Sequence, residues 1–291
     1  MIDLSSVHPV ISCDEKQLVH HLYRSLDENA YLLGLIQDYS VKDLAEMDWG
    51  RFYWCSFGGE IEGVLYLDIT GLAVLDNASP RSIRVFAEFI QENQMHVGRV
   101  IARKEVTEYL DQCLKKLDPR WRWISQAFEE EGMILDRGSI SPHQESRLRL
   151  ANPWEARDVA TGSAQAMEEE LRLRTGVEEF ERLYRSKVDL IKRKRYYILR
   201  EKDRILFQAF LCASLPDASL IQGVWVPADL RNQGIATRCM AQMCRECLKF
   251  SDHLILRVQK RNLPAHAVYT KVGFRPFMDY LSIWYDNPSG L

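Results

Sequence analysis

The stretch from Asp229 to Met240, DLRNQGIATRCM, carries residue types that could bind an anion. It follows a strand-like run, SLIQGVWVP, whose final proline lacks an N–H and cannot continue a sheet ladder. The first N–H groups of a helix have no partner within it and lie at the positive end of its dipole, where a phosphate can accept several of them. Gly234 and the small Ala236 would let a ligand approach the backbone, and Arg231 could add a charge-assisted contact. Taken alone, this R-x-x-G-x-A spacing also fits an ordinary helix start.

A second motif lies about 30 residues downstream, in RNLPAHAVYTKVGFRPF. On a helix that begins near Leu263, Ala265 and Tyr269 are four positions apart and share one face. Gly273 suits the position after the helix, where a left-handed backbone is common, and Phe274 would begin the last strand. The two motifs together are more specific than either alone.

Together, the two motifs resemble the GNAT superfamily of acyl-CoA-dependent N-acyltransferases over roughly residues 146–291. The resemblance implies that acetyl-CoA binds as co-substrate, with its pantetheine arm along the strand that ends at Val226 and its pyrophosphate on the amides that open the next helix. No metal is implied. The cofactor-binding residues that it indicates are Val224, Trp225, Val226, Arg231, Asn232, Gln233, Gly234, Ile235, Ala236, Thr237 and Asn262.

The same resemblance assigns chemical roles near the thioester. An acceptor amine must lose its proton before it attacks, and the departing thiolate needs only modest help from an acid. Tyr269 matches the position that donates this proton in the family, although a core tyrosine is the alternative. Many relatives have a glutamate base on the fourth strand where this chain has Gln222, and an amide cannot accept the proton.

An acidic run, AMEEELRL, falls in the region that lines the acceptor site in the family. Glu168, Glu169 and their neighbour Glu170 could recognise a cationic amine, or they could form a solvated helix face. We expect Glu168, Glu169 and Gln222 to contact the acceptor, and a water chain or an acid from elsewhere in the chain to serve as the base.

We expect the elements around these motifs to occur twice in the chain. RFYWCSFGGEIEGVLYLDIT and RYYILREKDRILFQAFLCAS, about half a chain apart, both predict a β-hairpin. In both halves a helix precedes the hairpin, and a strand, helix, strand, helix and strand follow it. We therefore predict a mixed α/β fold of two tandem GNAT-like domains, a degenerate one over 1–143 and an acetyl-CoA-binding one over 144–291. The first half has no R-x-x-G-x-A at its equivalent corner, where ASPRSIRVFAEF stands.

Composition narrows the classes of function. The chain has 291 residues, 46% hydrophobic, and a formal net charge of −3. A single basic run, KRKR, at a helix end does not favour nucleic-acid binding. No apolar run approaches a membrane span, no secretory signal is visible, and seven scattered cysteines suit a reducing, cytoplasmic compartment. The C-x-x-C of Cys244 and Cys247 is expected to pack a helix face rather than to bind a metal.

The sequence thus predicts a cytoplasmic acetyl-CoA-dependent N-acetyltransferase, a monomer or homodimer, that acts on a small-molecule or peptide amine. Direct attack of the amine on the thioester is the expected route. The alternative is a non-catalytic protein that binds acyl-CoA as a regulator or sensor. Gln222, in the place of an acid, and the degenerate first half keep that alternative open.

Overall fold

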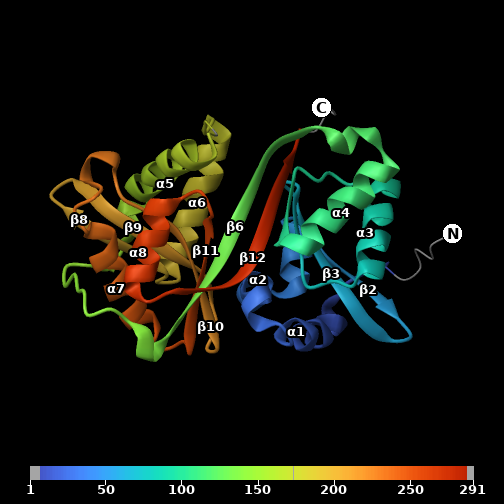
Figure 1. Ribbon diagram of the computed structural model, residues 1–291, viewed down its shortest axis with the longest axis horizontal. Coiled ribbons are helices and arrows are strands. Elements are labelled where there is room, and N and C mark those ends of the chain that lie inside the picture. Colours follow the sequence, from blue (N-terminus) through green and yellow to red (C-terminus); the bar gives the residue numbers. More distant parts are fainter. Residues whose placement is uncertain (1–6, 173, 287–291) are drawn as a thin grey trace. The chain divides into compact units, whose positions relative to one another are not determined.

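The computed structural model describes residues 7–172 and 174–286, which form two compact units of mixed α/β structure (Figure 1). The first unit takes its described residues from Met1–Gly132, Gln259–Arg261 and Phe277–Leu291, and the second from Met133–Val258 and Asn262–Pro276. The predicted division into 1–143 and 144–291 differs from the observed one in two places. Residues 133–143 lie in the second unit, and the end of the chain lies in the first.

The first unit is a mixed sheet with two pairs of helices. Its strands lie in the order β1-β2-β3-β4-β5-β12-β6, and only β4 and β5 among the registered pairs run parallel. Its elements are β1 (Val7–Pro9), α1 (Glu15–Tyr23), α2 (Leu26–Glu46), β2 (Gly50–Phe57), β3 (Glu60–Asp68), β4 (Leu72–Leu75), α3 (Pro80–Glu92), β5 (Arg99–Arg103), α4 (Lys104–Leu117), and parts of β6 (Ile124–Asp136) and β12 (Arg275–Tyr285).

The last strand of the sequence completes this first sheet. Tyr280–Trp284 of β12 pair antiparallel with Arg99–Arg103 of β5. The hydroxyl of Tyr285 donates to Asp111 at 3.0 Å, and its ring meets Trp121 edge to face. This pairing joins residues far apart in the sequence, which is why the observed units differ from the predicted halves.

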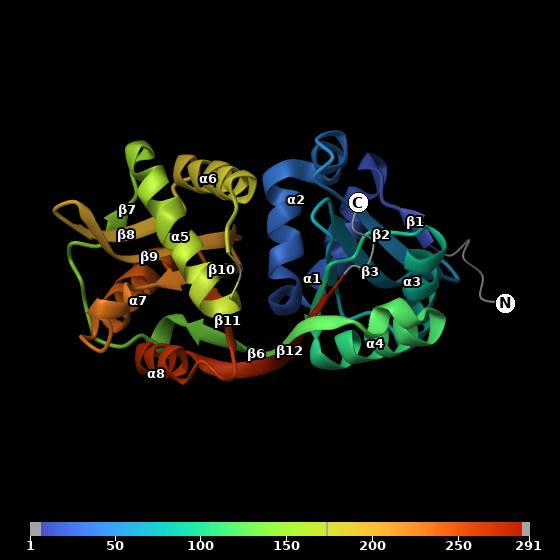
Figure 2. The same ribbon diagram turned by 90° about the horizontal axis from the view of Figure 1, so that it is seen from above.

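The second unit repeats the plan of the first. Its strands lie in the order β7-β8-β9-β10-β11-β6, with β10 and β11 parallel. Its elements are β7 (Arg149–Leu150), α5 (Ala156–Leu171), α6 (Val177–Lys192), β8 (Tyr196–Glu201), β9 (Arg204–Ser214), β10 (Ala218–Trp225), α7 (Ile235–Cys247), β11 (His253–Gln259), α8 (Leu263–Val272), and the last residues of β6. Helices α5 and α6 cover one face of this sheet, and α7 and α8 cover the other (Figure 2).

Both predicted hairpins are present, as β2–β3 and β8–β9. Between the two hairpins, RWRWISQAF and GMILDRG belong to a short 3-10 helix at Pro119–Arg122 and to one long strand, β6. In SRLRLANP only Arg149 and Leu150 pair with β8, as the two residues of β7.

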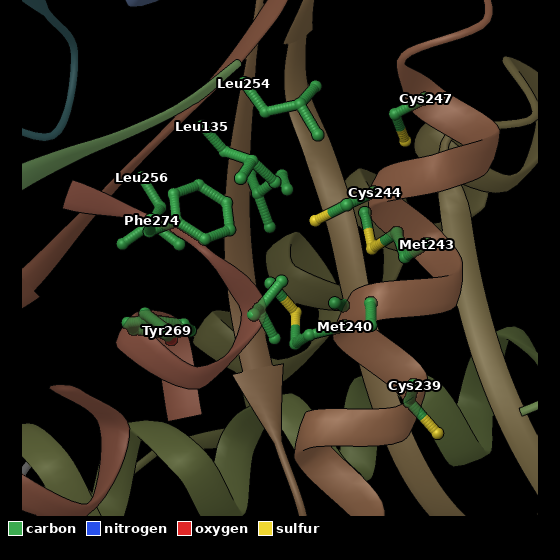
Figure 3. Packing of buried hydrophobic residues seen from close by; sticks show 14 of the residues in the cluster. Leu135, Cys239, Met240, Met243, Cys244, Cys247, Leu254, Leu256, Tyr269 and Phe274 are labelled. Atoms are coloured by element: carbon green, nitrogen blue, oxygen red, sulfur yellow. The ribbon is translucent and has the colours of Figure 1, made fainter. Parts of the chain in front are cut away.

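The core between α7, α8 and the sheet is rich in sulfur-containing side chains (Figure 3). Cys244 and Cys247 are fully buried free thiols on α7, and burial raises the pKa of both. Figure 3 shows them with Met240 and Met243 on the side of α7 that meets β11. The prediction that this C-x-x-C packs a helix face is confirmed. No helix among the described residues is both long enough and apolar enough to cross a membrane.

Candidate functional site

The corner between β10 and α7 presents unpaired helix amides, as the sequence predicts. β10 ends at Trp225, a 3-10 turn spans Ala228–Leu230, and α7 begins at Ile235. Gly234 is the N-cap, with φ +73°, and among the described residues no side chain caps the helix. The first intrahelical bond runs from Arg238 N to Gly234 O at 3.1 Å. The N–H groups of Ile235, Ala236 and Thr237 therefore remain open to an anion.

Gly234 is needed here for its backbone conformation. Its positive φ favours glycine, and the only atom that a Cβ would meet closely is the flexible Nη1 of Arg238, at 3.1 Å. Asn232, two residues before it, also has a positive φ, of +63°. A left-handed residue is one of the two conformations that make up an anion-binding nest.

The side chain of Arg231 contacts both the segment after β10 and the end of α5. Its Nε donates to the carbonyl of Val226 at 3.0 Å, and its Nη2 pairs with the carboxylate of Glu169 at the end of α5. Glu169, predicted to contact the acceptor, thus lies against the predicted cofactor loop. Both side chains of this pair are partly exposed, at 44% and 43%. An incoming phosphate would therefore compete with Glu169 for Arg231.

Strands β10 and β11 are in register only over their first parts. Ala218–Ile221 pair with His253–Leu256, whereas β10 continues to Trp225 and β11 to Gln259. Beyond Gln222 the register of β10 against β9 also shifts, and Gly223 has φ +65°. A Cβ on Gly223 would fall 2.3 Å from Cε1 of Phe210, so only glycine fits this bulge. Val224 and Val226, predicted to face the pantetheine arm, follow it directly.

Tyr269 lies inside the core of the second unit. It is 7% exposed and packs edge to face with Phe274, their ring centroids 6.0 Å apart (Figure 3). Burial, followed by the nearby negative charge of Glu170, raises the pKa of its hydroxyl. The group is therefore protonated at neutral pH and can donate a hydrogen bond.

Asn262 caps helix α8. Its Oδ1 accepts from the N–H of Ala265 at 3.2 Å, so this oxygen is already used, while its amide nitrogen could still donate to a ligand. Gly273 ends the helix with φ +118°, as the sequence predicts. The alignment of Asn262, Ala265 and Tyr269 on one short helix is therefore present.

The three predicted acceptor-side residues have different partners in the structure. Gln222 lies half-buried on β10 beside the bulge. Glu168 is exposed and lies 3.8 Å from Arg174, and Glu169 pairs with Arg231. Only Glu170 of the acidic run exerts a resolved charge effect on Tyr269. The role of Glu168, Glu169 and Gln222 in binding the acceptor stays a prediction.

The equivalent corner of the first unit is closed. α3 begins with Pro80, which has no N–H, and the Ser79 hydroxyl accepts from the N–H of Ser82 at 3.2 Å. Asp76, just after β4, accepts from Val64 N and is hydrogen-bonded to Nε2 of His21, at 2.8 Å each. Of the first three positions of α3, Pro80 thus lacks an N–H and the N–H of Ser82 is capped, whereas the first three N–H groups of α7 are open.

Sequence reasoning missed the bulge at Gly223 and a buried lysine, Lys187. A glycine inside a strand pattern signals a bulge, and SLIQGVWVP contains one. Lys187 falls in line with Phe180, Tyr184 and Ile191 at helical spacing, so its place on the apolar face was readable. The buried oxygen of Gln208 and indole nitrogen of Trp225 had no such signal.

Comparisons with known proteins agree with this architecture. Residues 164–274 match the family model "Acetyltransferase (GNAT) family". A search of curated proteins gave no match. Solved structures similar in fold include a GNAT-family acetyltransferase from Colwellia psychrerythraea, at 14% identity and TM-score 0.60, with 96% of this chain and 99% of that chain covered.

Two further structures extend the likeness over both units. A GCN5-related N-acetyltransferase from Sphaerobacter thermophilus has 16% identity and TM-score 0.60, over 95% of this chain and 94% of that one. A tandem GNAT protein from the clavulanic acid biosynthesis pathway has 11% identity and TM-score 0.56, over 97% and 99%. At these identities the likeness is one of fold.

The end of the β10–β11 register beside an open helix N-terminus agrees with the fold of the GNAT structures that this chain resembles. The family model that matches residues 164–274 is that of the GNAT acetyltransferases. The chain as a whole has the fold of tandem GNAT proteins.

Proposed function

We propose that this protein is an acetyl-CoA-dependent N-acetyltransferase that acts through its second unit. Two features of one corner carry the proposal. The N-terminus of α7 is uncapped, and the register between β10 and β11 ends nearby in the chain, at Ile221 and Leu256. The pyrophosphate would accept from the amides of Gln233 to Thr237. The pantetheine arm would lie along Val224–Val226, and the amide nitrogen of Asn262 could donate to it.

The reaction follows from these positions. A neutral primary amine attacks the thioester carbonyl, the C–S bond breaks, and an amide and a thiol are formed. A backbone N–H near Val224–Val226 would stabilise the oxyanion formed during attack. Tyr269, whose burial keeps it protonated, would donate a hydrogen bond to the departing thiolate.

The proton of the amine requires a route that Gln222 cannot supply. Glu169 is occupied by Arg231. A water chain that leads to solvent therefore fits the observed contacts better than a direct carboxylate base. The acceptor is proposed to be a small-molecule or peptide amine.

The second candidate function is a non-catalytic acyl-CoA-binding protein, which the amide of Gln222 favours. A panel of amines incubated with acetyl-CoA, scored for free thiol, separates the two. Amine-dependent thiol release that falls at least about tenfold in Tyr269→Phe supports the enzyme. Tyr197→Phe, which removes a hydroxyl from the same core, is the matched control and should keep its turnover. Saturable acetyl-CoA binding with no turnover on any amine would support the binding protein instead.

A further inference from the structure

Helices α5 and α6 cover one face of the sheet of the second unit (Figure 2). Side chains from these two helices and from β8, β9 and β10 bring a group of buried polar atoms together there. We call it the polar cluster; it comprises Ser163, Lys187, Tyr196, Gln208 and Trp225. Gln208 Nε2 donates to the Ser163 hydroxyl at 3.1 Å, and that hydroxyl lies 3.2 Å from the hydroxyl of Tyr196. These bonds fix one side of the cluster and leave three polar groups unused.

Lys187 is the first of the three. It is 5% exposed, and among the described residues no carboxylate pairs with it. Its Nζ lies 4.2 Å from the ring centroid of Phe210 and 5.9 Å from that of Tyr196. Burial lowers the pKa of Lys187 to about 8, so the amine is mostly charged at neutral pH. The rings offset part of its lost hydration but supply no counter-charge.

The other two groups are a donor and an acceptor on paired strands. Oε1 of Gln208 and Nε1 of Trp225 are buried with no hydrogen-bond partner among the described residues. The two residues are Cα partners across β9 and β10. A Cβ on Gly162 would lie 2.7 Å from Oε1 of Gln208 and 3.1 Å from Cζ3 of Trp225, so both side chains lie close against this glycine of α5.

The cluster lies next to the bulge of β10. The Nζ of Lys187 lies over the ring of Phe210, and this ring occupies the space that a side chain at Gly223 would need. Trp225 lies on β10 within the segment that is proposed to face the pantetheine arm. A ligand held by Lys187, Gln208 and Trp225 would therefore lie close to the proposed position of the thioester.

We propose that the acceptor carries a carboxylate beside its amine, as an amino acid does, and that Lys187 and the Trp225 indole N–H bind this carboxylate. Gln208 Oε1 accepts one N–H of the amine and leaves the nitrogen lone pair for attack. The carboxylate supplies the counter-charge that Lys187 lacks. This inference rests on the proposed function, adds no step to it, and makes Lys187 a residue that sets specificity.

The test uses pairs of acceptors that differ only in the carboxylate: L-phenylalanine with phenethylamine, L-tryptophan with tryptamine, L-histidine with histamine, and L-leucine with 3-methylbutylamine. With the full chain and acetyl-CoA, kcat/KM should favour the acid in at least one pair by about tenfold or more. Lys187→Met should bring that ratio close to one, chiefly through a higher KM for the acid. Trp225→Phe, which keeps the apolar ring, should shift it in the same direction.

Lys192→Met is the matched control, because Lys192 is exposed at the end of the same helix. It should keep the wild-type ratio. Equal or better turnover of the amines, or a preference that survives in folded Lys187→Met, overturns the inference. A further contrary result is acetyl-CoA binding by calorimetry without turnover of any acid and without a rise in melting temperature that depends on the carboxylate. That result would overturn the inference and leave acetyl-CoA binding itself intact. Failure to bind acetyl-CoA overturns both the inference and the proposed function.

Discussion

At the scale of single residues, the second unit combines an open set of amides with a buried ammonium. Gly234 leaves the amides of Ile235, Ala236 and Thr237 unpaired, and Lys187 has no carboxylate among its described contacts. Both features cost free energy in a protein without a bound ligand, because buried or aligned polar groups need partners. Both are offset when an anion binds.

The cost at Lys187 predicts a pH dependence of stability. The pKa of Lys187 is lowered to about 8 when folded, against 10.5 as its ordinary value. Between pH 8 and pH 10.5 the unfolded chain binds more protons than the folded chain. The free energy of unfolding of the wild type therefore increases as pH rises through this range, by about 3 kcal/mol in total. Lys187→Met lacks this contribution. The variant's relative stability should therefore be greatest below pH 8 and decrease toward pH 10.5.

Urea unfolding of both proteins at closely spaced pH values measures this difference. Tyr196 and Cys212, which lie near Lys187, are the same in both proteins, so their own titration largely cancels. A difference between the two proteins that stays flat from pH 7 to 10.5 would show that Lys187 is not buried as a charge.

At the scale of elements, β10 is shaped by one glycine. Gly223→Ala must adopt a positive φ and also displace the ring of Phe210, 2.3 Å from the new Cβ. Gly58→Ala, the control, has φ +59° but meets nothing within 4 Å. We expect about 1 kcal/mol of destabilisation for the control and at least about 2 kcal/mol more for Gly223→Ala.

Calorimetric melting and acetyl-CoA titration should therefore separate the two glycine variants. Gly223→Ala should melt lower than Gly58→Ala and bind acetyl-CoA more weakly, since its bulge positions Val224 and Val226. Equal melting and equal affinity would mean that the bulge has no part in the site.

Helices α3 and α7 show how the two equivalent corners differ in the N–H groups that they leave open. Ser79 and Pro80 close the start of α3, whereas Gly234 leaves α7 open. These differences depend on a few adjacent residues. The open amides of α7, and the lack of the R-x-x-G-x-A motif in the first half, could therefore both be predicted from the sequence. Gly273 and Asn262 were likewise readable, because helix ends depend on a few adjacent residues.

At the scale of the whole molecule, the sequence indicated the two-part plan but not how the strands are shared. β12 joins β5 through a pairing between residues about 180 positions apart, and periodicity carries no such information. The partners of buried polar groups were also hidden. Lys187 stands on an apolar stripe that can be read, but Gln208 and Trp225 become neighbours only through the β9–β10 register.

Shared strands predict that the first unit needs the end of the chain. Arg99 Nε donates to Ser282 at 2.8 Å and Thr107 donates to the Leu281 carbonyl at 3.1 Å, in addition to the β5 ladder. A chain that ends at Pro276 should lose hydrogen-exchange protection in β5 and unfold at lower temperature. Full protection of Arg99–Arg103 in that shortened chain would contradict this account of the first unit.

The central claim is that the open N-terminus of α7 binds the pyrophosphate of acetyl-CoA. Gly234→Asp and Gly234→Asn test it most directly, since both side chains tolerate a positive φ and they differ mainly in one negative charge. Titration calorimetry with acetyl-CoA should give a Kd at least about tenfold higher for Gly234→Asp than for Gly234→Asn, a difference of about 1.4 kcal/mol. Equal affinities in the two folded variants would contradict the claim.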